Sequence, residues 1–196
     1  MMALIHTIVE GVLDEAMAAR LIKEAGHTPG TCYGKKGFAY IREKLGAFNQ
    51  SAVGTHYLAL VDFMDTGLPC PGAVVANWLP HRQSNMLFRI VVRELESWLL
   101  ADQKNLSAFL HIDPTKVPQN PEQLTDPKQT LVNLARASRR KQIRESLVPD
   151  SGSSAAIGKL YNSEISQFIT HQWSVAGACQ NAPSLERCYK ILQSLT

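Results

Sequence analysis

Three apolar segments that each end at an acidic residue constrain the fold of this chain more than any other feature of its sequence. The segments and the acids that follow them are Leu4–Val9 with Glu10, His56–Val61 with Asp62, and Leu87–Val92 with Arg93-Glu94. A shorter apolar segment, Thr31–Tyr33, adds a fourth candidate strand. A helix-forming stretch over 14–25 follows Leu4–Val9, and another over 38–48 follows Thr31–Tyr33. Strands that alternate with helices predict an α/β fold with a mostly parallel four-stranded sheet flanked by helices.

The acids at the strand ends predict a site at one edge of this sheet. In open parallel sheets, ligands collect beyond the carboxyl ends of the strands. We therefore expect Glu10, Asp62 and Glu94 to converge if their strands are neighbours, although the sequence leaves the pairing order open.

The second half of the chain has a helical pattern interrupted by prolines. Asp126-Pro127 provides an N-cap and a first-turn proline for a helix that is expected to run to about Glu145. Ser163–Thr170 and Ser184–Leu195 are further helix candidates. A chain of 196 residues supports one sizeable core. We expect residues 1–102 to form the α/β core and residues 103–196 to form a helical extension packed on it as a single compact unit.

Location is predicted from what the sequence lacks. No apolar run approaches the roughly 20 residues of a membrane-spanning helix, and the first ten residues lack the pattern of a secretory signal. The four cysteines show no C-x-x-C spacing, which is typical of reduced thiols. A cytoplasmic protein with no membrane partner is therefore expected.

The carboxylates predict metal-dependent phosphodiester chemistry. Cleavage of a phosphodiester builds negative charge on the attacking and leaving oxygens, and Mg²⁺ or Mn²⁺ held by carboxylates stabilises that charge. Asp62, Asp65 and Glu94 are the candidate metal ligands. Glu10 is the candidate acid/base, because crowding among carboxylates raises the pKa.

Basic residues predict contacts with a phosphate backbone. Arg136, Arg140 and Arg144 recur at helical spacing, and Arg139 lies among them. Lys128, near the start of the same predicted helix, is expected to reach the site. An acidic protein surface is the alternative partner for this segment.

The loop Gly34-Lys35-Lys36-Gly37 is a weaker candidate for phosphate binding. It precedes a helix, but it lacks the spacing of a nucleotide-binding P-loop. We expect Lys35 and Lys36 to contact a nucleic acid backbone, with an ordinary polar turn as the alternative.

Two motifs carry a resemblance to Toprim domains, which occur in topoisomerases, primases and the OLD family of nucleases. Ile8-Val9-Glu10-Gly11-Val12-Leu13-Asp14 resembles the first Toprim motif, and Ala59-Leu60-Val61-Asp62-Phe63-Met64-Asp65 resembles the second. The resemblance implies that Glu10 is the acid/base and that the acids of the second motif bind Mg²⁺. The usual second motif has acids two residues apart, whereas Asp62 and Asp65 are three apart.

A narrower resemblance covers nearly the whole chain. The chain is similar to a bacterial Toprim-like family catalogued as domain of unknown function 4276, through blocks at 88–102, 126–136 and 138–149. That resemblance implies a neighbouring ATPase of the OLD or structural-maintenance type and a role in antiphage defence or DNA repair.

The resulting hypothesis is a Mg²⁺-dependent nuclease or nicking subunit that hydrolyses DNA or RNA. The alternative is a non-catalytic Toprim-like binding or effector subunit that docks an ATPase. The sequence contains no zinc-hydrolase or serine-hydrolase motif, and it offers no base-reading motif that would distinguish DNA from RNA. It leaves open whether one or two metals bind and what oligomer the chain forms.

Overall fold

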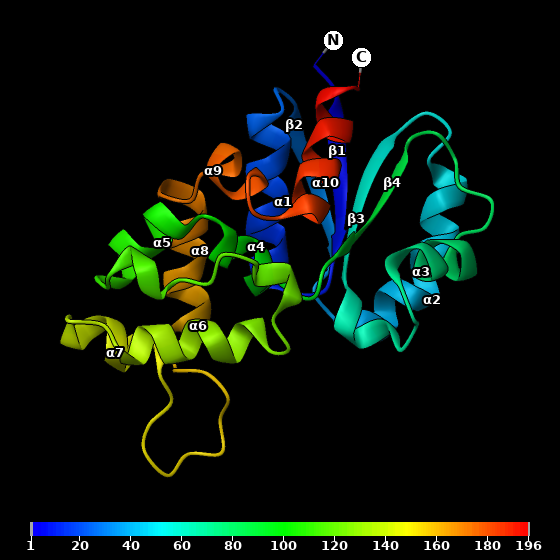
Figure 1. The fold of residues 1–196 in the computed structure, drawn as a ribbon. Coiled ribbons are helices and arrows are strands. Elements are labelled where there is room, and N and C mark those ends of the chain that lie inside the picture. The colour runs from blue at the N-terminus through cyan, green and yellow to red at the C-terminus, as the bar shows by residue number, and fades with distance from the viewer. Residues whose placement is uncertain (1, 196) are drawn as a thin grey trace.

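The computed structural model describes residues 2–195 as an α/β fold around a four-stranded, all-parallel sheet. The strands are β1 (Leu4–Val9), β2 (Thr28–Gly34), β3 (His56–Asp62) and β4 (Met86–Val91), in the spatial order β2-β1-β3-β4. A helical C-terminal half follows the sheet (Figure 1). The predicted parallel sheet with a helical C-terminal portion is confirmed.

Helices connect the strands and then complete the chain. The helices of the first half are α1 (Val12–Glu24), α2 (Phe38–Ser51), the 3₁₀ turn η1 (Phe63–Thr66) and α3 (Pro71–Trp78). Those of the second half are α4 (Leu95–Ala101), α5 (Gln103–Leu110), the 3₁₀ turns η2 (Pro114–Lys116) and η3 (Pro121–Gln123), α6 (Pro127–Arg136), α7 (Lys141–Leu147), α8 (Tyr161–His171), α9 (Val175–Cys179) and α10 (Pro183–Gln193).

The sheet is buried on both faces because its side chains alternate between two cores. Leu58 and Leu60 of β3 face a large core that also contains α1, α10 and the other C-terminal helices. Ala59 and Val61 face a smaller core beneath α2 and α3. Figure 1 shows these two groups of helices on opposite sides of the sheet. Since the larger core runs from β1 to α10, the C-terminal half is continuous with the α/β core.

The structure corrects one predicted helix. The single helix expected from Asp126 to Glu145 is divided into α6 and α7, and Arg140 between them is extended. The buried hydroxyl of Ser138 accepts a hydrogen bond from the Arg140 backbone N–H at 3.1 Å, and the Arg139 N–H is donated to the carbonyl of His111 at 3.4 Å. These bonds replace helical ones, as serine side chains commonly do near helix ends. The expected helical face with Arg136, Arg140 and Arg144 therefore does not exist.

The described residues 2–195 include no helix long and apolar enough to cross a membrane. All four cysteines are free thiols.

Candidate carboxylate site at the ends of the strands

The strand order brings Glu10 and Asp62 together. Strands β1 and β3 are parallel neighbours, so the residues that follow their carboxyl ends lie at the same edge. The Glu10 carboxylate oxygen Oε1 accepts a 3.0 Å hydrogen bond from the backbone N–H of Asp62. The predicted convergence of these two acids is thus confirmed, and β4 brings Glu94 to the same edge because it pairs with β3 through Asp62 and Val91.

A third carboxylate, Asp14, joins this pair from the first turn of α1. Its Oδ2 accepts a 3.0 Å hydrogen bond from the backbone N–H of Gly11, which is the N-cap of α1. Only 8% of Asp14 is exposed. Asp14 was not among the site residues expected from the sequence. Its position four residues after Glu10, in a helix that begins directly after the strand, is the signal that would have identified it.

Burial is the largest cause of a raised pKa in all three carboxylates. Burial, followed by the charges of Asp14 and Glu10, raises the pKa of Asp62 well above its ordinary value. Burial is also the main reason that the pKa of Glu10 rises to about 7 and that of Asp14 to about 6. The Oδ1 atom of Asp62 is buried and has no hydrogen-bond partner. The cluster therefore holds more carboxylate oxygens than protein donors satisfy.

Asp65 lies beside this cluster but is exposed. It belongs to η1, the 3₁₀ turn that follows β3, and its charge contributes to the raised pKa of Glu10 and of Asp14. This turn keeps Asp65 close enough to act electrostatically on the cluster without a direct hydrogen bond to it.

Glu94 is held by Lys128 rather than facing Glu10 and Asp62 directly. The backbone N–H of Lys128 donates to Oε1 of Glu94 at 2.7 Å, and the Lys128 ammonium Nζ donates to Oε2 at 2.9 Å. Both oxygens of the predicted metal ligand Glu94 therefore have protein partners. The contact also satisfies a backbone N–H in the first turn of α6.

Lys128 connects Glu94 to a second acid, Glu96, which was not expected at the site from the sequence. The ammonium of Lys128 lies 3.6 Å from Oε2 of Glu96, and the Tyr161 hydroxyl donates to Oε1 of Glu96 at 3.0 Å. Burial raises the pKa of Glu96 to about 7 even beside Lys128. Burial lowers the pKa of Lys128, but the charges of Glu96 and Glu94 have the larger combined effect. The pKa of Lys128 therefore lies above its ordinary value.

A pocket of about 160 Å³ opens at this edge of the sheet. Its lining includes Asp14, Asp62, Glu96, Lys128 and Tyr161. The pocket thus places three acids, one ammonium and one phenol around a volume sufficient for a small polar group.

Comparison with protein-family models, curated proteins and solved structures finds no significant match to this chain.

The Toprim resemblance remains a prediction.

The loop with Lys35 and Lys36 borders Glu10. The Lys35 N–H donates to the carbonyl of Val9 at 2.9 Å, and the Gly37 N–H donates to the carbonyl of Glu10 at 3.0 Å. The side chain of Lys35 pairs with Glu15 at 3.0 Å, and the Lys36 ammonium lies 5.4 Å from the centre of the Tyr40 ring. Both lysines are exposed at the edge that carries the carboxylates.

The four predicted arginines lie outside the pocket. Arg136 ends α6, Arg139 and Arg140 are exposed in the break before α7, and Arg144 donates to the carbonyl of Ser138 at 2.6 Å. Arg136 is eight residues after Lys128, which corresponds to about 12 Å along the α6 axis. Lys128 alone among the basic residues of this segment lines the pocket.

The acids at this edge offer oxygen ligands but no preformed metal site. No group of three or more His, Cys, Asp or Glu within residues 2–195 is arranged to hold a metal ion. The donor chemistry nevertheless fits a hard cation: Asp62 Oδ1 is buried without a donor, and the carboxylates of Glu10 and Asp14 lie at the same edge. Asp62 and Asp14 are therefore the residues that would hold a metal, with Glu10 beside them.

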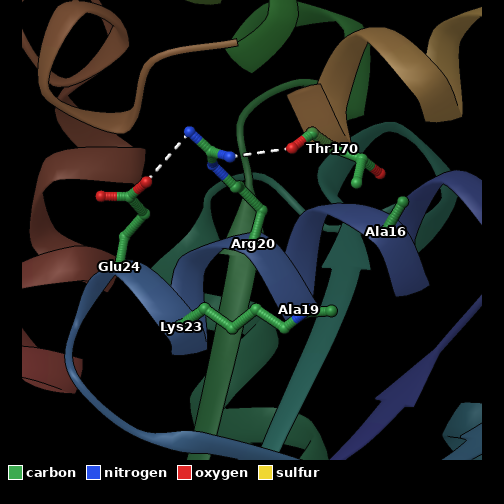
Figure 2. Close-up of a pocket in the computed structure, with 6 residues that line it drawn as sticks. All are labelled: Ala16, Ala19, Arg20, Lys23, Glu24 and Thr170. Atoms are coloured by element: carbon green, nitrogen blue, oxygen red, sulfur yellow. Dashed lines mark hydrogen bonds and ion pairs between the residues drawn. The ribbon is translucent and has the colours of Figure 1, made fainter. Parts of the chain in front are cut away.

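A separate hollow on the outer side of α1 has a structural explanation. Figure 2 shows Arg20 there, donating to the carbonyl of Thr170 at 2.8 Å and pairing with Glu24 at 2.9 Å. Arg20 thereby links α1 to α8, and the polar groups of this hollow serve helix packing.

Proposed function

We propose that this chain is a Toprim-like, Mg²⁺- or Mn²⁺-dependent nuclease or nicking subunit that hydrolyses nucleic acid phosphodiesters. The observation that supports it most directly is the meeting of Glu10, Asp14 and Asp62 at the ends of β1 and β3, with Asp62 Oδ1 buried and unpartnered. A buried carboxylate oxygen without a donor is costly, and a bound cation would remove that cost.

The roles of the residues follow from their environments. A divalent ion held by Asp62 and Asp14 would supply charge stabilisation to the phosphate oxygens. Glu10, whose pKa of about 7 matches neutral pH, can accept a proton from a water molecule and release it. Lys128, fixed by Glu94 and Glu96, presents a constant positive charge to an anionic substrate in the pocket.

The basic residues support a substrate that is a phosphate polymer. Lys35 and Lys36 lie at the same edge as Glu10, and Arg136, Arg139 and Arg140 continue from the far end of α6. A strand that passes over the pocket would meet positive charge on both sides, which neutralises backbone phosphates irrespective of base sequence. Competition between DNA and RNA oligonucleotides of equal length would identify the substrate class.

The experiment that tests the proposal combines metal titration with a nuclease assay. Mg²⁺ or Mn²⁺ is expected to raise the melting temperature of the chain, and Glu10→Gln and Asp62→Asn are each expected to lower cleavage by about 100-fold or more. Glu43→Gln, at an exposed acid on α2, is the matched control and should cleave as wild type does. Equal cleavage by all four proteins would refute the nuclease assignment.

One observation favours the non-catalytic alternative, in which the scaffold docks an ATPase of the OLD or structural-maintenance type. Lys128 already provides a cation to Glu94 and Glu96, and the acids of residues 2–195 include no preformed set of three ligands. For this alternative we expect no change in melting temperature with Mg²⁺ and no cleavage with or without the ATPase. Thermal shift and cleavage assays in the presence of the partner therefore separate the two functions.

A further inference from the structure

An arginine interrupts an otherwise apolar strand face. Leu87 and Val91 of β4 belong to the larger core, and side chains of a strand alternate between two faces, so Arg89 lies on the same face as both. Every other residue of β4 is buried, whereas Arg89 is only partly buried. A cation in such a position is unfavourable unless an anion compensates its charge.

No anion of the described chain compensates Arg89. Its Nε is buried without a hydrogen-bond partner, and its guanidinium forms no ion pair within residues 2–195. The neighbouring group on α10 is the thiol of Cys188. Burial raises the pKa of this thiol to about 12, so it stays neutral and cannot serve as the counter-ion at physiological pH.

Two acids close to α10 have other partners. Glu186 pairs with Lys190 at 2.6 Å on the same helix. Glu122 accepts two hydrogen bonds from Ser184, one from the backbone N–H at 2.9 Å and one from the hydroxyl at 2.6 Å. Neither carboxylate pairs with Arg89, which therefore lacks the acid that usually accompanies a buried arginine.

Two further arginines add positive charge around Arg89. Arg82 lies in the turn before β4, and Arg187 is exposed on α10. Burial, followed by the charges of these two arginines, lowers the pKa of Arg89. Within residues 2–195, none of the three forms an ion pair. The fold thus brings like charges together, which is unfavourable without a bound anion.

A hollow of about 150 Å³ adjoins two of these arginines. Arg89 and Arg187 line it from β4 and α10, and Pro71 and Val75 line it from α3. No acidic side chain of the described residues is part of its lining. We name this region the α3–α10 hollow. Its volume is sufficient for one phosphate group.

We propose that the α3–α10 hollow binds a phosphate dianion through Arg89 and Arg187, either as free phosphate or as the phosphomonoester of a small molecule. A guanidinium pairs with phosphate oxygens through parallel N–H bonds, and two negative charges compensate two arginines. The terminal nitrogens of Arg89 are the donors, because Nε is enclosed. Pro71 and Val75 form an apolar wall for the carbon part of a phosphomonoester.

Charge and size favour this ligand over larger anionic partners. A single carboxylate would compensate only one of the two arginines. A nucleic acid distributes its charge along a chain, with one negative charge at each phosphodiester, whereas the hollow accommodates a single group. The α3–α10 hollow shares no lining residue with the pocket that contains Asp62 and Lys128, so binding there does not depend on the proposed nuclease function.

Thermal melts and calorimetry of the full-length chain with inorganic phosphate test the site. EDTA removes divalent metal, and a pH of about 8 keeps phosphate mostly dianionic. About 10 mM phosphate is expected to raise the melting temperature by about 2 °C or more over sodium chloride of equal ionic strength. Titration calorimetry should give a dissociation constant below about 1 mM.

Phenyl phosphate, titrated in the same way, identifies the source of the phosphate group. Binding at least about threefold tighter than that of inorganic phosphate indicates a phosphomonoester whose carbon part contacts the α3 wall. Equal or weaker binding indicates free phosphate.

Substitutions of the two arginines separate a binding role from a structural one. Arg187→Gln, at an exposed residue, should weaken phosphate binding by about tenfold or more. Lys190→Gln removes the same charge one turn further along α10 and should bind phosphate as wild type does. Arg89→Met should abolish the response to phosphate and raise the melting temperature in phosphate-free buffer, because it replaces an uncompensated cation with an apolar side chain.

Four results would each overturn the proposal. These are no response of the wild type to about 10 mM phosphate, an equal response in Arg187→Gln, and a lower melting temperature of Arg89→Met without phosphate, which would mean that the guanidinium is already compensated within the chain. The fourth is displacement of phosphate by an oligonucleotide without terminal phosphates, if Arg187→Gln abolishes oligonucleotide binding. A response that is kept in Arg187→Gln and lost in Lys128→Met would place the phosphate in the carboxylate pocket instead.

Discussion

Glu10 combines a position at the centre of the cluster with a pKa that lies near neutral pH. Its carboxylate accepts the Asp62 N–H, so it is fixed against β3, while burial and the charges of Asp14 and Asp65 favour its protonated form. A carboxyl group that titrates near pH 7 can both take and give a proton under physiological conditions. This property belongs to the folded chain, because an exposed glutamate titrates much lower.

The raised pKa values predict how stability depends on pH. Burial raises the pKa of Glu10 to about 7 and that of Asp14 to about 6, so between about pH 4 and 7 the folded chain binds more protons than the unfolded chain. The stabilisation associated with these groups is complete at low pH and is lost as the pH rises through that range. In Glu10→Gln, the free energy of unfolding that is lost on raising the pH should be smaller by about 1–2 kcal/mol. This is less than the pKa shift of Glu10 alone would give, because Glu10 is partly exposed.

Thermal melts of wild type and Glu10→Gln at pH 5 and pH 8, without divalent metal, measure this effect. A change of 1 kcal/mol corresponds to about 2–4 °C for a chain of this size. Glu43→Gln serves as the control and should retain the wild-type pH dependence. An identical dependence in Glu10→Gln would contradict the assignment of a raised pKa to Glu10.

At the scale of elements, Lys128 connects α6 to α4. Its ammonium bridges Glu94 and Glu96, whose side chains are only 10% and 2% exposed, so its loss would leave two acids without their cation. We expect Lys128→Met to lower the free energy of unfolding by about 2–4 kcal/mol at pH 7. Urea denaturation measures this value.

Paired variants give the control for Lys128. Lys141→Met, at an exposed residue paired with Glu145, should cost less than about 0.5 kcal/mol. Adding Glu96→Gln to Lys128→Met should recover part of the lost stability, because it removes one uncompensated charge. No recovery in the double variant would mean that Lys128 stabilises the fold through packing of its methylene groups alone.

The exposed arginines between α6 and α7 give a second prediction about an element of the fold. If Arg139 and Arg140 contact phosphates, Arg139→Gln combined with Arg140→Gln should weaken DNA binding and reduce the slope of log K against log salt by about 2. Anisotropy titrations at several salt concentrations measure the slope. Lys190→Gln, at an exposed residue of α10, should keep the wild-type slope; an unchanged slope in the arginine variant would exclude this segment from the interface.

The sequence predicted strands more reliably than the details of helices. Apolar runs bounded by acids located β1, β3 and β4 to within a residue or two, because burial on both faces requires continuous apolar sequence. The break after α6 was missed, since the Arg139 N–H there bonds to the carbonyl of His111 in a distant turn. Helix α3 was not anticipated either.

The site was predictable where a residue directly follows a strand and not where tertiary contacts position it. Glu10 and Asp62 follow strands whose carboxyl ends must share an edge in a parallel sheet. Glu96 and Tyr161 are 65 residues apart and meet only because α8 packs near α4. Lys128 was expected to reach the site and does line the pocket, but its pairing with Glu94 was not expected.

At the scale of the whole molecule, the larger core determines how the two halves depend on each other. Leu21 and Ile22 of α1 share that core with Phe168 of α8 and Leu185 of α10. The fragment 1–102 would expose the face of α1 and of the sheet that these helices cover. We therefore expect the fragment to lack a cooperative thermal transition, whereas the full chain melts cooperatively.

Circular dichroism melts and limited proteolysis of both chains check this expectation. A fragment 1–102 that melts cooperatively near the temperature of the full chain would identify residues 1–102 as an independent folding unit instead.

The His27 imidazole links the start of β1 to the end of α10, on the side of the molecule away from the carboxylate cluster. His27 accepts the backbone N–H of Ala3 at 3.1 Å and contacts the carbonyl of Leu192 at 2.8 Å, so the start of β1 and the end of α10 are held together. Figure 1 shows the start of β1 and the end of α10 at the pole opposite the carboxyl ends of the strands. A tether joined at either end, whether to a bead, a surface or a fluorescent protein, would leave the pocket with Asp62 pointing outward and accessible to long polymers.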